Sequence, residues 1–288
     1  MKSKLNKKYS VLVLLFVLCS MLLITACFPA GIDSSVINDE RLTVIAFDVD
    51  QADCIYIHTP QDENILVDTA NNSDGQEISN QLYNLGVKQI DYLFLTHPHA
   101  DHIGGADDII KNFDIGKIYM PKVYHDTQTY MDVLNAAKNK GIKIQEAKPQ
   151  IITLNACTIN MLAPIKEGYD DLNAYSIVFK LTYKDFDMLF TGDLPKQEEG
   201  ELLNCDLQAD ILKVAHHGSN DSTSENFLRQ VGCEYAVISV GEDNSYGHPN
   251  DDTLVLLEKY NVKIFRTDLQ GDIIITTDGK EVNIENVL

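Results

Sequence analysis

Basic residues are scarce in this chain of 288 residues: lysine and arginine together number 23, against 43 aspartates and glutamates, and the formal net charge is −20. The sequence contains no basic stripe. Because neutralised phosphates supply most non-specific affinity for nucleic acids, this lack excludes tight nucleic-acid binding through the protein's own surface. The acidity favours solubility and repels polyanions at long range. A nucleic acid stays open as a substrate, but not as one held by a basic surface.

Closely spaced cysteine pairs are also missing. Besides Cys19 and Cys27, the remaining cysteines lie within or beside apolar runs: Cys54, Cys157, Cys205 and Cys233. This placement favours small buried hydrophobic side chains over disulfides. No internal linker, repeat or low-complexity segment interrupts the chain after its N-terminal region, and about 250 residues can bury a large core. We therefore expect one folded domain.

The N-terminal residues have the pattern of an export signal. Four lysines precede an apolar run that ends at Ile24, and small residues stand before Cys27. This pattern predicts a bacterial lipoprotein signal peptide over residues 1–26, lipidation of Cys27, a linker over 27–41 and a folded domain over 42–288. The domain would lie at the extracytoplasmic face of the membrane, and removal of the four lysines with residues 1–26 would give the remaining chain a formal charge of −20 − 4 = −24. The alternative is an uncleaved membrane anchor.

Short β-branched runs alternate with helical patterns along the rest of the chain. Strands are expected at Leu42–Val49, Cys54–His58, Ile65–Asp68, Tyr92–Thr96, Lys117–Met120, Cys157–Leu162, Ser176–Tyr183 and Asp187–Phe190. Helices are expected at Glu77–Leu85, Ile103–Asn112 and Tyr130–Lys140, with Gly141 as the C-terminal cap of the last one. The alternation predicts a layered α/β architecture.

Five of the eight histidines lie in two short segments, at residues 96–102 and 215–219. Asp193 lies between these segments in the chain. Histidine and aspartate are ligands of divalent metals, and the step from His97 to His99 lets both imidazoles reach one ion. Apolar strand endings at Phe94-Leu95, Leu189-Phe190 and Leu212–Ala215 come directly before these residues, as expected for ligands on loops held by a rigid scaffold. The pattern is typical of a two-metal hydrolase.

The segments His97-Pro98-His99-Ala100-Asp101-His102, Thr191-Gly192-Asp193 and His216-His217-Gly218-Ser219 resemble, in this order, the metal motifs of the metallo-β-lactamase superfamily. Together with Asp48–Asp53 and Tyr246-Gly247-His248-Pro249, they resemble more narrowly the corresponding domain of ComEC-type DNA-uptake proteins and their stand-alone relatives. The resemblance spans about Leu42 to Leu288. It implies a four-layer αββα sandwich and hydrolysis that depends on two divalent ions.

The resemblance also implies a ligand set. Zinc is the preferred metal and manganese the alternative, with His97 and His99 at the first ion, Asp101, His102 and His217 at the second, and Asp193 as a bridge. His216 and His217 stay alternatives for one position; His217 is preferred, and His216 would then face the substrate. Asn173 occupies the place of a further histidine of the first site, so this site should bind metal more weakly. His125 is interpreted as an ordinary loop histidine.

Supporting roles are expected for several other residues. Asp68 would fix a metal-bound imidazole by accepting its second N–H, and Asp48 and Asp53 would be structural or would support the ligands. Asp101 is expected to orient the attacking water. His248 would act as a general acid or oxyanion contact, with a turn residue as the alternative interpretation, and Ser219 would donate to a substrate oxyanion.

Three functional hypotheses follow from this site. The first is a metal-dependent phosphodiesterase, including a nuclease; the second is a lactonase, a β-lactamase-like enzyme or a phosphoester hydrolase of the cell envelope. The third is a non-catalytic surface lipoprotein with a binding or accessory role, which the retained metal ligands disfavour. The expected partners are a small-molecule or phosphodiester substrate and the membrane, reached through Cys27. The protein is otherwise expected to be a monomer.

Overall fold

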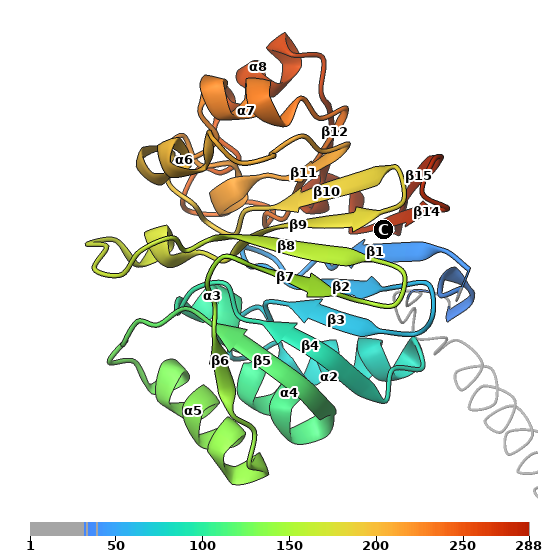
Figure 1. Ribbon diagram of the computed structural model, residues 1–288, viewed down its shortest axis with the longest axis vertical. Helices are drawn as coiled ribbons and strands as arrows, with labels where there is room; N and C mark the ends of the chain where they lie inside the picture. The colour runs from blue at the N-terminus through green and yellow to red at the C-terminus, as the bar shows by residue number, and fades with distance from the viewer. Residues whose placement is uncertain (1–31, 33, 39, 288) are drawn as a thin grey trace, which may run out of the picture. The chain divides into compact units, whose positions relative to one another are not determined.

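Two β-sheets pack face to face, and helices cover the outer surface of each sheet (Figure 1). The computed structural model describes residues 32, 34–38 and 40–287, and the chain from Ile32 on folds as one unit. The layers run helices, sheet, sheet, helices. The expected four-layer αββα sandwich is therefore confirmed.

The first sheet combines the N-terminal strands with the last two strands of the chain. Its order is β15 (Val282–Val287), β14 (Asp272–Thr277), β1 (Leu42–Ala46), β2 (Ile55–His58), β3 (Asn64–Val67), β4 (Gln89–Phe94), β5 (Asp114–Met120) and β6 (Ile144–Glu146). Neighbours are antiparallel from β15 to β3 and parallel from β3 to β6. Parallel strands are buried on both faces, which explains the unbroken apolar run at the end of β4.

The second sheet contains the middle part of the chain. Its order is β13 (Lys263–Arg266), β12 (Tyr235–Ile238), β11 (Ile211–Lys213), β10 (Phe186–Phe190), β9 (Val178–Tyr183), β8 (Thr158–Ala163) and β7 (Gln150–Thr153). Strands β10 to β13 are parallel, and β7 to β10 are antiparallel. Phe94, Phe179 and Phe190 stack in series between the two sheets, with centroid distances of 5.2 and 4.5 Å.

Helices pack against the outer faces through two further apolar cores. The first sheet is covered by α2 (Gly75–Asn84), α4 (Ala106–Asn112) and α5 (Gln128–Lys140), and the second by α6 (Lys196–Leu202), α7 (Glu225–Val231) and α8 (Asp251–Lys259). Short helical turns complete the list: η1 (Ser34–Val36), α3 (Ala100–Ile103), η2 (Leu172–Tyr175), η3 (Ala215–Gly218) and α9 (Thr267–Gln270).

The ends of α5 follow local capping chemistry. The Thr127 side chain accepts a hydrogen bond from the Tyr130 N–H, and Gly141 closes the helix with a φ of 71°. The prediction that Gly141 caps this helix is confirmed. The helix expected over Ile103–Asn112 is instead divided into α3 and α4 at Gly104, where a Cβ atom would lie 2.3 Å from the Asn71 carbonyl carbon. The close approach of two backbones therefore separates the metal motif from the helix that follows it.

The residues expected to form a linker partly join the domain. Ile32, Val36 and Ile37 pack against the core under α2, and the Thr43 hydroxyl donates a hydrogen bond to the Val36 carbonyl. The boundary expected at residue 42 is therefore too late by about ten residues, because these apolar side chains cover core surface. The expected signal peptide over 1–26 and Cys27 lie outside the described residues. In the part of the chain that the structure describes, no helix has the length and apolarity needed to cross a membrane.

The cysteines of the folded part are free. Cys54, Cys157 and Cys233 are buried, and Cys205 is half-buried. The interpretation of these residues as hydrophobic side chains rather than disulfide partners is thereby confirmed.

Candidate metal centre

Four loops bring charged and imidazole side chains together at one end of the two sheets. Asp68 follows β3, His97 is the third residue after β4, Asp193 is the third residue after β10, and the His216-His217 pair follows β11 within η3. The last two residues of each of these strands are buried, so each loop starts from a fixed point. The strand ends therefore position a constellation whose members are far apart in the sequence.

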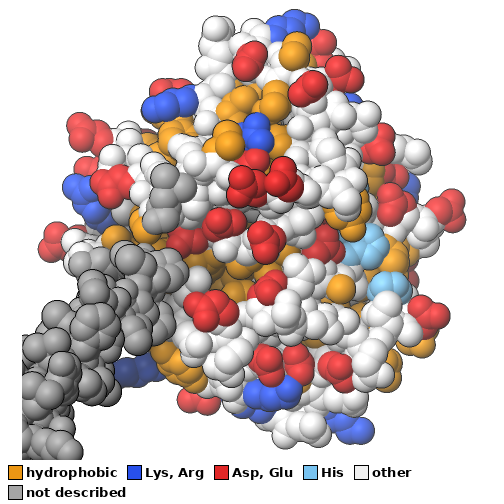
Figure 2. Space-filling view, turned by 180° about the vertical axis from the view of Figure 1, so that it is seen from behind, with side chains coloured by type: hydrophobic (Ala, Val, Ile, Leu, Met, Phe, Trp, Pro, Cys, Tyr) orange, Lys and Arg blue, Asp and Glu red, His pale blue; other side chains and the backbone are white. Residues whose placement is uncertain are grey.

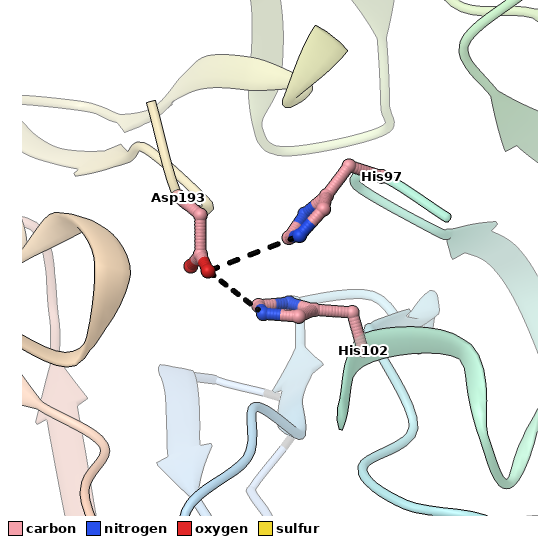
Figure 3. Close-up of side chains that lie close together, drawn as sticks. All are labelled: His97, His102 and Asp193. Carbon is pink, nitrogen blue, oxygen red and sulfur yellow. Dashed lines mark ion pairs between the residues drawn. The ribbon is translucent and has the colours of Figure 1, made fainter. Parts of the chain in front are cut away.

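His97, His102 and Asp193 form the centre of this constellation (Figure 3). Figure 3 shows the Asp193 carboxylate directed at both imidazoles, which reach it from a different loop. The Oδ2 atom of Asp193 lies 3.8 Å from Nε2 of His97 and 3.3 Å from Nε2 of His102. All three residues are buried. Asp193 is held in place by its backbone N–H, which donates to the Ser176 hydroxyl at 3.0 Å.

One side of the centre has the donors expected for the first ion. His97 Nε2 lies 3.0 Å from His99 Nδ1, while His97 Nδ1 lies 3.2 Å from the Thr96 hydroxyl. Burial, and then the neighbouring His102, hold the pKa of the His97 imidazole well below its usual range, so this imidazole is neutral. Asn173, on η2, lines the same cavity, and its side-chain oxygen is buried. This side therefore presents two imidazoles and one amide.

The other side has the donors expected for the second ion. Asp101 Oδ2 lies 3.7 Å from His217 Nε2 and 3.9 Å from His102 Nε2. His217 Nδ1 lies 2.8 Å from the Ser239 carbonyl oxygen, so the ring directs Nε2 into the centre. His102 is oriented in the same manner, because its Nδ1 lies 2.8 Å from Asp68 Oδ2. Asp68 also accepts hydrogen bonds from the Thr96 N–H and hydroxyl.

His216 occupies a different position from His217. Its Nε2 lies 3.7 Å from Asp193 Oδ2, but its side chain is partly exposed. Both histidines have positive φ, 52° for His216 and 53° for His217, which costs energy for residues with a Cβ atom. This strained turn directs the two successive rings into the same cavity, one at its buried wall and one at its rim.

Four buried polar atoms at this point have no hydrogen-bond partner among the described residues: His102 Nε2, His217 Nε2, Asp193 Oδ1 and Asn173 Oδ1. Leaving such atoms buried and unsatisfied costs free energy, so a cluster of them indicates a ligand. Imidazole nitrogens and carboxylate oxygens are the donors that zinc and manganese take in proteins. The residues present therefore fit divalent metal ions.

The electrostatics of the centre also favour cations. Burial lowers the pKa of the His102 imidazole, but the carboxylates of Asp193 and Asp68 outweigh burial and hold that pKa well above its usual range. Burial raises the pKa of the Asp193 carboxyl, but His102 and His217 bring it well below its usual range. The buried carboxylates thus keep positive charge in the centre, as a proton or as a metal ion.

The cavity at the centre has a volume of about 340 Å³. It is lined by Gln51, His99, Ala100, Asp101, Asn173, Asp193, His216, His217, Tyr246 and His248. The His248 ring centroid lies 5.5 Å from that of His216, so His248 belongs to the cavity rim. Figure 2 shows histidine side chains reaching the surface of a face on which acidic side chains are more frequent than basic ones.

Ser219, expected to contact the substrate, and His125, interpreted as a loop histidine, both lie outside the cavity lining. Ser219 does not line the cavity; its hydroxyl accepts a hydrogen bond from the Asp221 N–H and so holds the turn after His217. This placement gives Ser219 a role in loop shape rather than in contact with substrate. His125 lies outside the ligand groups, with Nδ1 3.1 Å from the Pro98 carbonyl oxygen and its ring centroid 6.1 Å from that of His99. It therefore packs against the metal motif rather than lying remote from it.

Sequence analysis missed three groups that support the site. Gln51 lies 3.5 Å from His248 Nδ1 through its side-chain nitrogen. Ser239 orients His217, as described above. Lys213, within a strand ending treated as apolar, is buried against Asp53 at 2.9 Å. Gln51 lies within the Asp48–Asp53 motif but was given no role, and Ser239 belongs to no motif. A lysine inside an apolar strand next to the metal histidines was a signal for a buried charge pair.

Comparisons with known proteins agree with this geometry. The family model of the metallo-β-lactamase superfamily matches residues 47–242. ComE operon protein 3 of Bacillus subtilis is 35% identical over 191 residues, which are 65% of this chain and 25% of that protein. Competence protein ComA of Neisseria gonorrhoeae is 28% identical over 240 residues, which are 82% of this chain and 32% of that protein. The chain thus spans between a quarter and a third of these curated relatives.

A solved structure shows the same fold at low sequence identity. The metallo-β-lactamase fold protein YhfI from Bacillus subtilis is 12% identical, covers 82% of this chain and 100% of its own, and has a TM-score of 0.54. The fold implies divalent metal ions, and the buried donors described above fit them. From the family match, the order of its motifs and the layered fold, it follows that this chain belongs to the metallo-β-lactamase superfamily of metal-dependent hydrolases and is related to ComEC-type proteins.

Proposed function

We propose that this protein is a phosphodiesterase, with nucleic acid among its candidate substrates, that uses two divalent ions. The observation that carries the proposal is the pair of donor sets that share the buried Asp193. His97, His99 and Asn173 would hold one ion, and Asp101, His102 and His217 the other. Two ions bound there would supply a nucleophile from water at neutral pH and stabilise the attacking and leaving oxygens of the ester.

The residues at the rim would supply the remaining chemistry. Asp101 faces the cavity with a partly exposed carboxylate and would orient the attacking water. Burial, and then His216, lower the pKa of the His248 imidazole, so this ring is neutral at pH 7. With Gln51 close to Nδ1, the proton of the His248 ring resides on Nε2, from which the ring would donate a hydrogen bond that stabilises the leaving oxygen.

Zinc is the proposed native metal, with manganese tolerated at the first site. An amide oxygen from Asn173 is a weaker zinc ligand than a third imidazole, and manganese accepts oxygen donors readily. The resemblance to ComEC-type DNA-uptake proteins supports a phosphodiester substrate, because the nucleic acid that such proteins take up is a phosphodiester. The formal charge of −20 argues against tight binding of a polyanion, so we propose transient contact with the strand rather than storage of it.

The protein is further proposed to be a monomeric lipoprotein on the extracytoplasmic face of the membrane, anchored at Cys27. The lysines before the apolar run and the small residues before Cys27 support this proposal. Two acyl chains would provide a stable anchor, which one chain would not.

Purified protein loaded with zinc or with manganese would test the activity. It should hydrolyse bis-p-nitrophenyl phosphate or single-stranded DNA faster than a lactone or a cephalosporin. His97→Ala should abolish this hydrolysis, whereas His125→Ala, a matched histidine outside the ligand groups, should retain it. Preference for the lactone or the cephalosporin would replace the phosphodiesterase proposal, and metal binding without turnover of any of the four compounds would favour the accessory role.

A further inference from the structure

The loop after β12 places a tyrosine at the mouth of the cavity and is held together by hydrogen bonds between its own residues. The Asn244 side chain donates to the carbonyl oxygens of Gly241 and His248 at 3.0 and 2.6 Å. It also accepts from the N–H groups of Tyr246 and His248 at 3.2 and 3.0 Å. Gly247 between them has a φ of 71°, which few side chains tolerate. One asparagine therefore fixes the position of Tyr246.

The ring of Tyr246 is nevertheless largely exposed. Its side chain is among the most exposed large hydrophobic groups described, at 72%, and its hydroxyl has no hydrogen-bond partner among the described residues. Tyr83, at 48%, differs, because its hydroxyl donates to the Asn112 carbonyl oxygen. A rigid loop that presents a free aromatic face indicates a contact with something outside the chain.

The neighbours of Tyr246 connect it to the metal centre. Its ring lies 5.8 Å from the His248 ring, at an interplanar angle of 26°, and the His248 ring lies 5.5 Å from that of His216. His216 in turn lies 3.7 Å from Asp193. A planar group on Tyr246 would thus continue a row of rings that ends at the metal ligands.

We propose that Tyr246 is a stacking surface for a nucleobase next to the scissile phosphodiester. This inference rests on the proposed phosphodiesterase function and specifies its substrate class. Base stacking on an aromatic side chain contributes affinity for each base and does not depend on charge. In a chain of net charge −20, which lacks a basic surface, stacking supplies affinity that phosphate contacts cannot.

The test uses three diesters that share one leaving group. In each diester the phosphate carries one p-nitrophenyl group, which is the leaving group. The second group on the phosphate is thymidine, attached through its 5′ oxygen, 5,6-dihydrothymidine attached in the same way, or methyl. Dihydrothymidine keeps the sugar and the hydrogen-bonding edge of the base but loses the planar aromatic face. Wild-type protein loaded with zinc should prefer thymidine over both other esters in kcat/KM, chiefly through KM.

Three variants test whether the preference for thymidine depends on the Tyr246 ring. Tyr246→Ala should reduce the preference for thymidine over the methyl ester roughly tenfold, and Tyr246→Phe should keep it. Tyr124→Ala removes a tyrosine of equal exposure, 71%, that does not line the cavity, and should leave the preference unchanged. The proposal is overturned if Tyr246→Ala keeps the preference, or if dihydrothymidine is used as well as thymidine, which would indicate recognition of the sugar.

A binding measurement separates this inference from the proposed function. Thymidine 5′-monophosphate and inorganic phosphate are titrated calorimetrically into the zinc-loaded protein, which requires no turnover. Tighter binding of the nucleotide that Tyr246→Ala removes would support the stacking surface even if hydrolysis of the diesters failed. Equal binding of both compounds, together with hydrolysis of all three esters at similar kcat/KM, would retain the phosphodiesterase and reject the stacking surface.

Discussion

The ammonium group of Lys213 lies 2.9 Å from the carboxylate of Asp53, and both side chains are almost completely buried, although 160 residues separate them. The Asp53 backbone N–H donates to the Asp101 carbonyl oxygen, and the Asp53 carbonyl accepts from Ala70. Asp53 Oδ2 also lies 4.0 Å from His102 Nδ1. The pair therefore links β11, which leads into the metal histidines of η3, to the loop of the first metal motif.

Lys213→Met should destabilise the protein and weaken metal binding. Removing one partner of a buried ion pair leaves an uncompensated charge, at a cost of about 3–5 kcal/mol. Thermal unfolding with and without zinc measures both effects. Lys180→Met is the matched control: Lys180 is also buried, but its partner Asp206 is exposed and the pair lies away from the cavity. Adding Asp53→Asn to Lys213→Met should recover stability, and no recovery would show that the pair itself is not the cause.

The bridging role of Asp193 predicts a graded loss of metal. Asp193→Ala should lose both ions and all hydrolysis, because its carboxylate lies between the two donor sets. His99→Ala should mainly weaken the first site and keep some activity, which added manganese or zinc restores. Metal content and phosphodiester hydrolysis, measured on variants with matched circular dichroism, check this order. If His125→Ala lost a metal and His99→Ala did not, the first site would be built on the wrong histidine.

Metal binding should occur in two steps of unequal affinity. The second set contains two imidazoles and a carboxylate besides Asp193, whereas the first contains an amide in place of a third imidazole. Titration of metal-free protein with zinc should end near two ions per chain, with the first-site ion removed first by a chelator. Metal at about 1,000 times its Kd should raise the free energy of unfolding by about 4 kcal/mol. A single tight binding event would contradict the two-ion site.

Asp272 should reduce stability at neutral pH. Burial raises the pKa of its carboxyl to about 6, above the ordinary value of 3.8. The folded state therefore binds more protons than the unfolded state between these values, and the free energy of unfolding falls as the pH rises through this window. Asp272→Asn keeps an acceptor for the Asp48 N–H and should raise the melting temperature at pH 7.5 but not at pH 3.5.

Asp278 provides the opposite control for that measurement. Backbone donors at Glu281 and Lys280 lower the pKa of its exposed carboxyl. Asp278→Asn should therefore lose stability at neutral pH, with the loss disappearing as the pH falls below the lowered pKa. The same sign of effect in both variants would refute the assignment for Asp272.

Cys27→Ala should prevent lipid attachment, and the protein should then be retained with its signal or released. A labelled-lipid chase followed by membrane fractionation tests this, with Cys205→Ala as a control in the folded part. Unchanged lipid incorporation would move the acceptor to another residue.

Sequence patterns predicted the parts of the site that lie within short segments. The order of apolar strand endings and ligands placed His97 and Asp193 in the loops that follow strands, where the structure has them, and His102 lies on the short helix α3 directly after His97 and His99. The cap of α5 at Gly141 could be predicted for the same reason, because it depends only on residues that are close together in the sequence. The division of the helix at Gly104 was not predicted, because it depends on the approach of Asn71 from another loop.

Contacts between distant segments could not be derived from the sequence. The Lys213 and Asp53 pair depends on the packing of two sheets, and the contact of Gln51 with His248 joins residues 197 positions apart. The residues next to Lys213 and Gln51 in the sequence do not indicate which distant residue each of them contacts. The self-contained hydrogen bonds of Asn244 involve nearby residues, but only the backbone geometry of the loop reveals them.

The pairing of β1 with β14 determines when the first sheet can be completed. Leu42 lies opposite Thr277, so the strand made first must pair with one that leaves the ribosome more than two hundred residues later. Until β14 has been made, one edge of β1 is unpaired, and its apolar residues, which are buried in the folded protein, are exposed. Strand pairings between residues so far apart in the sequence form slowly. A chain stopped before residue 272 should therefore aggregate rather than fold, and the first sheet should be completed only after β14 has been made.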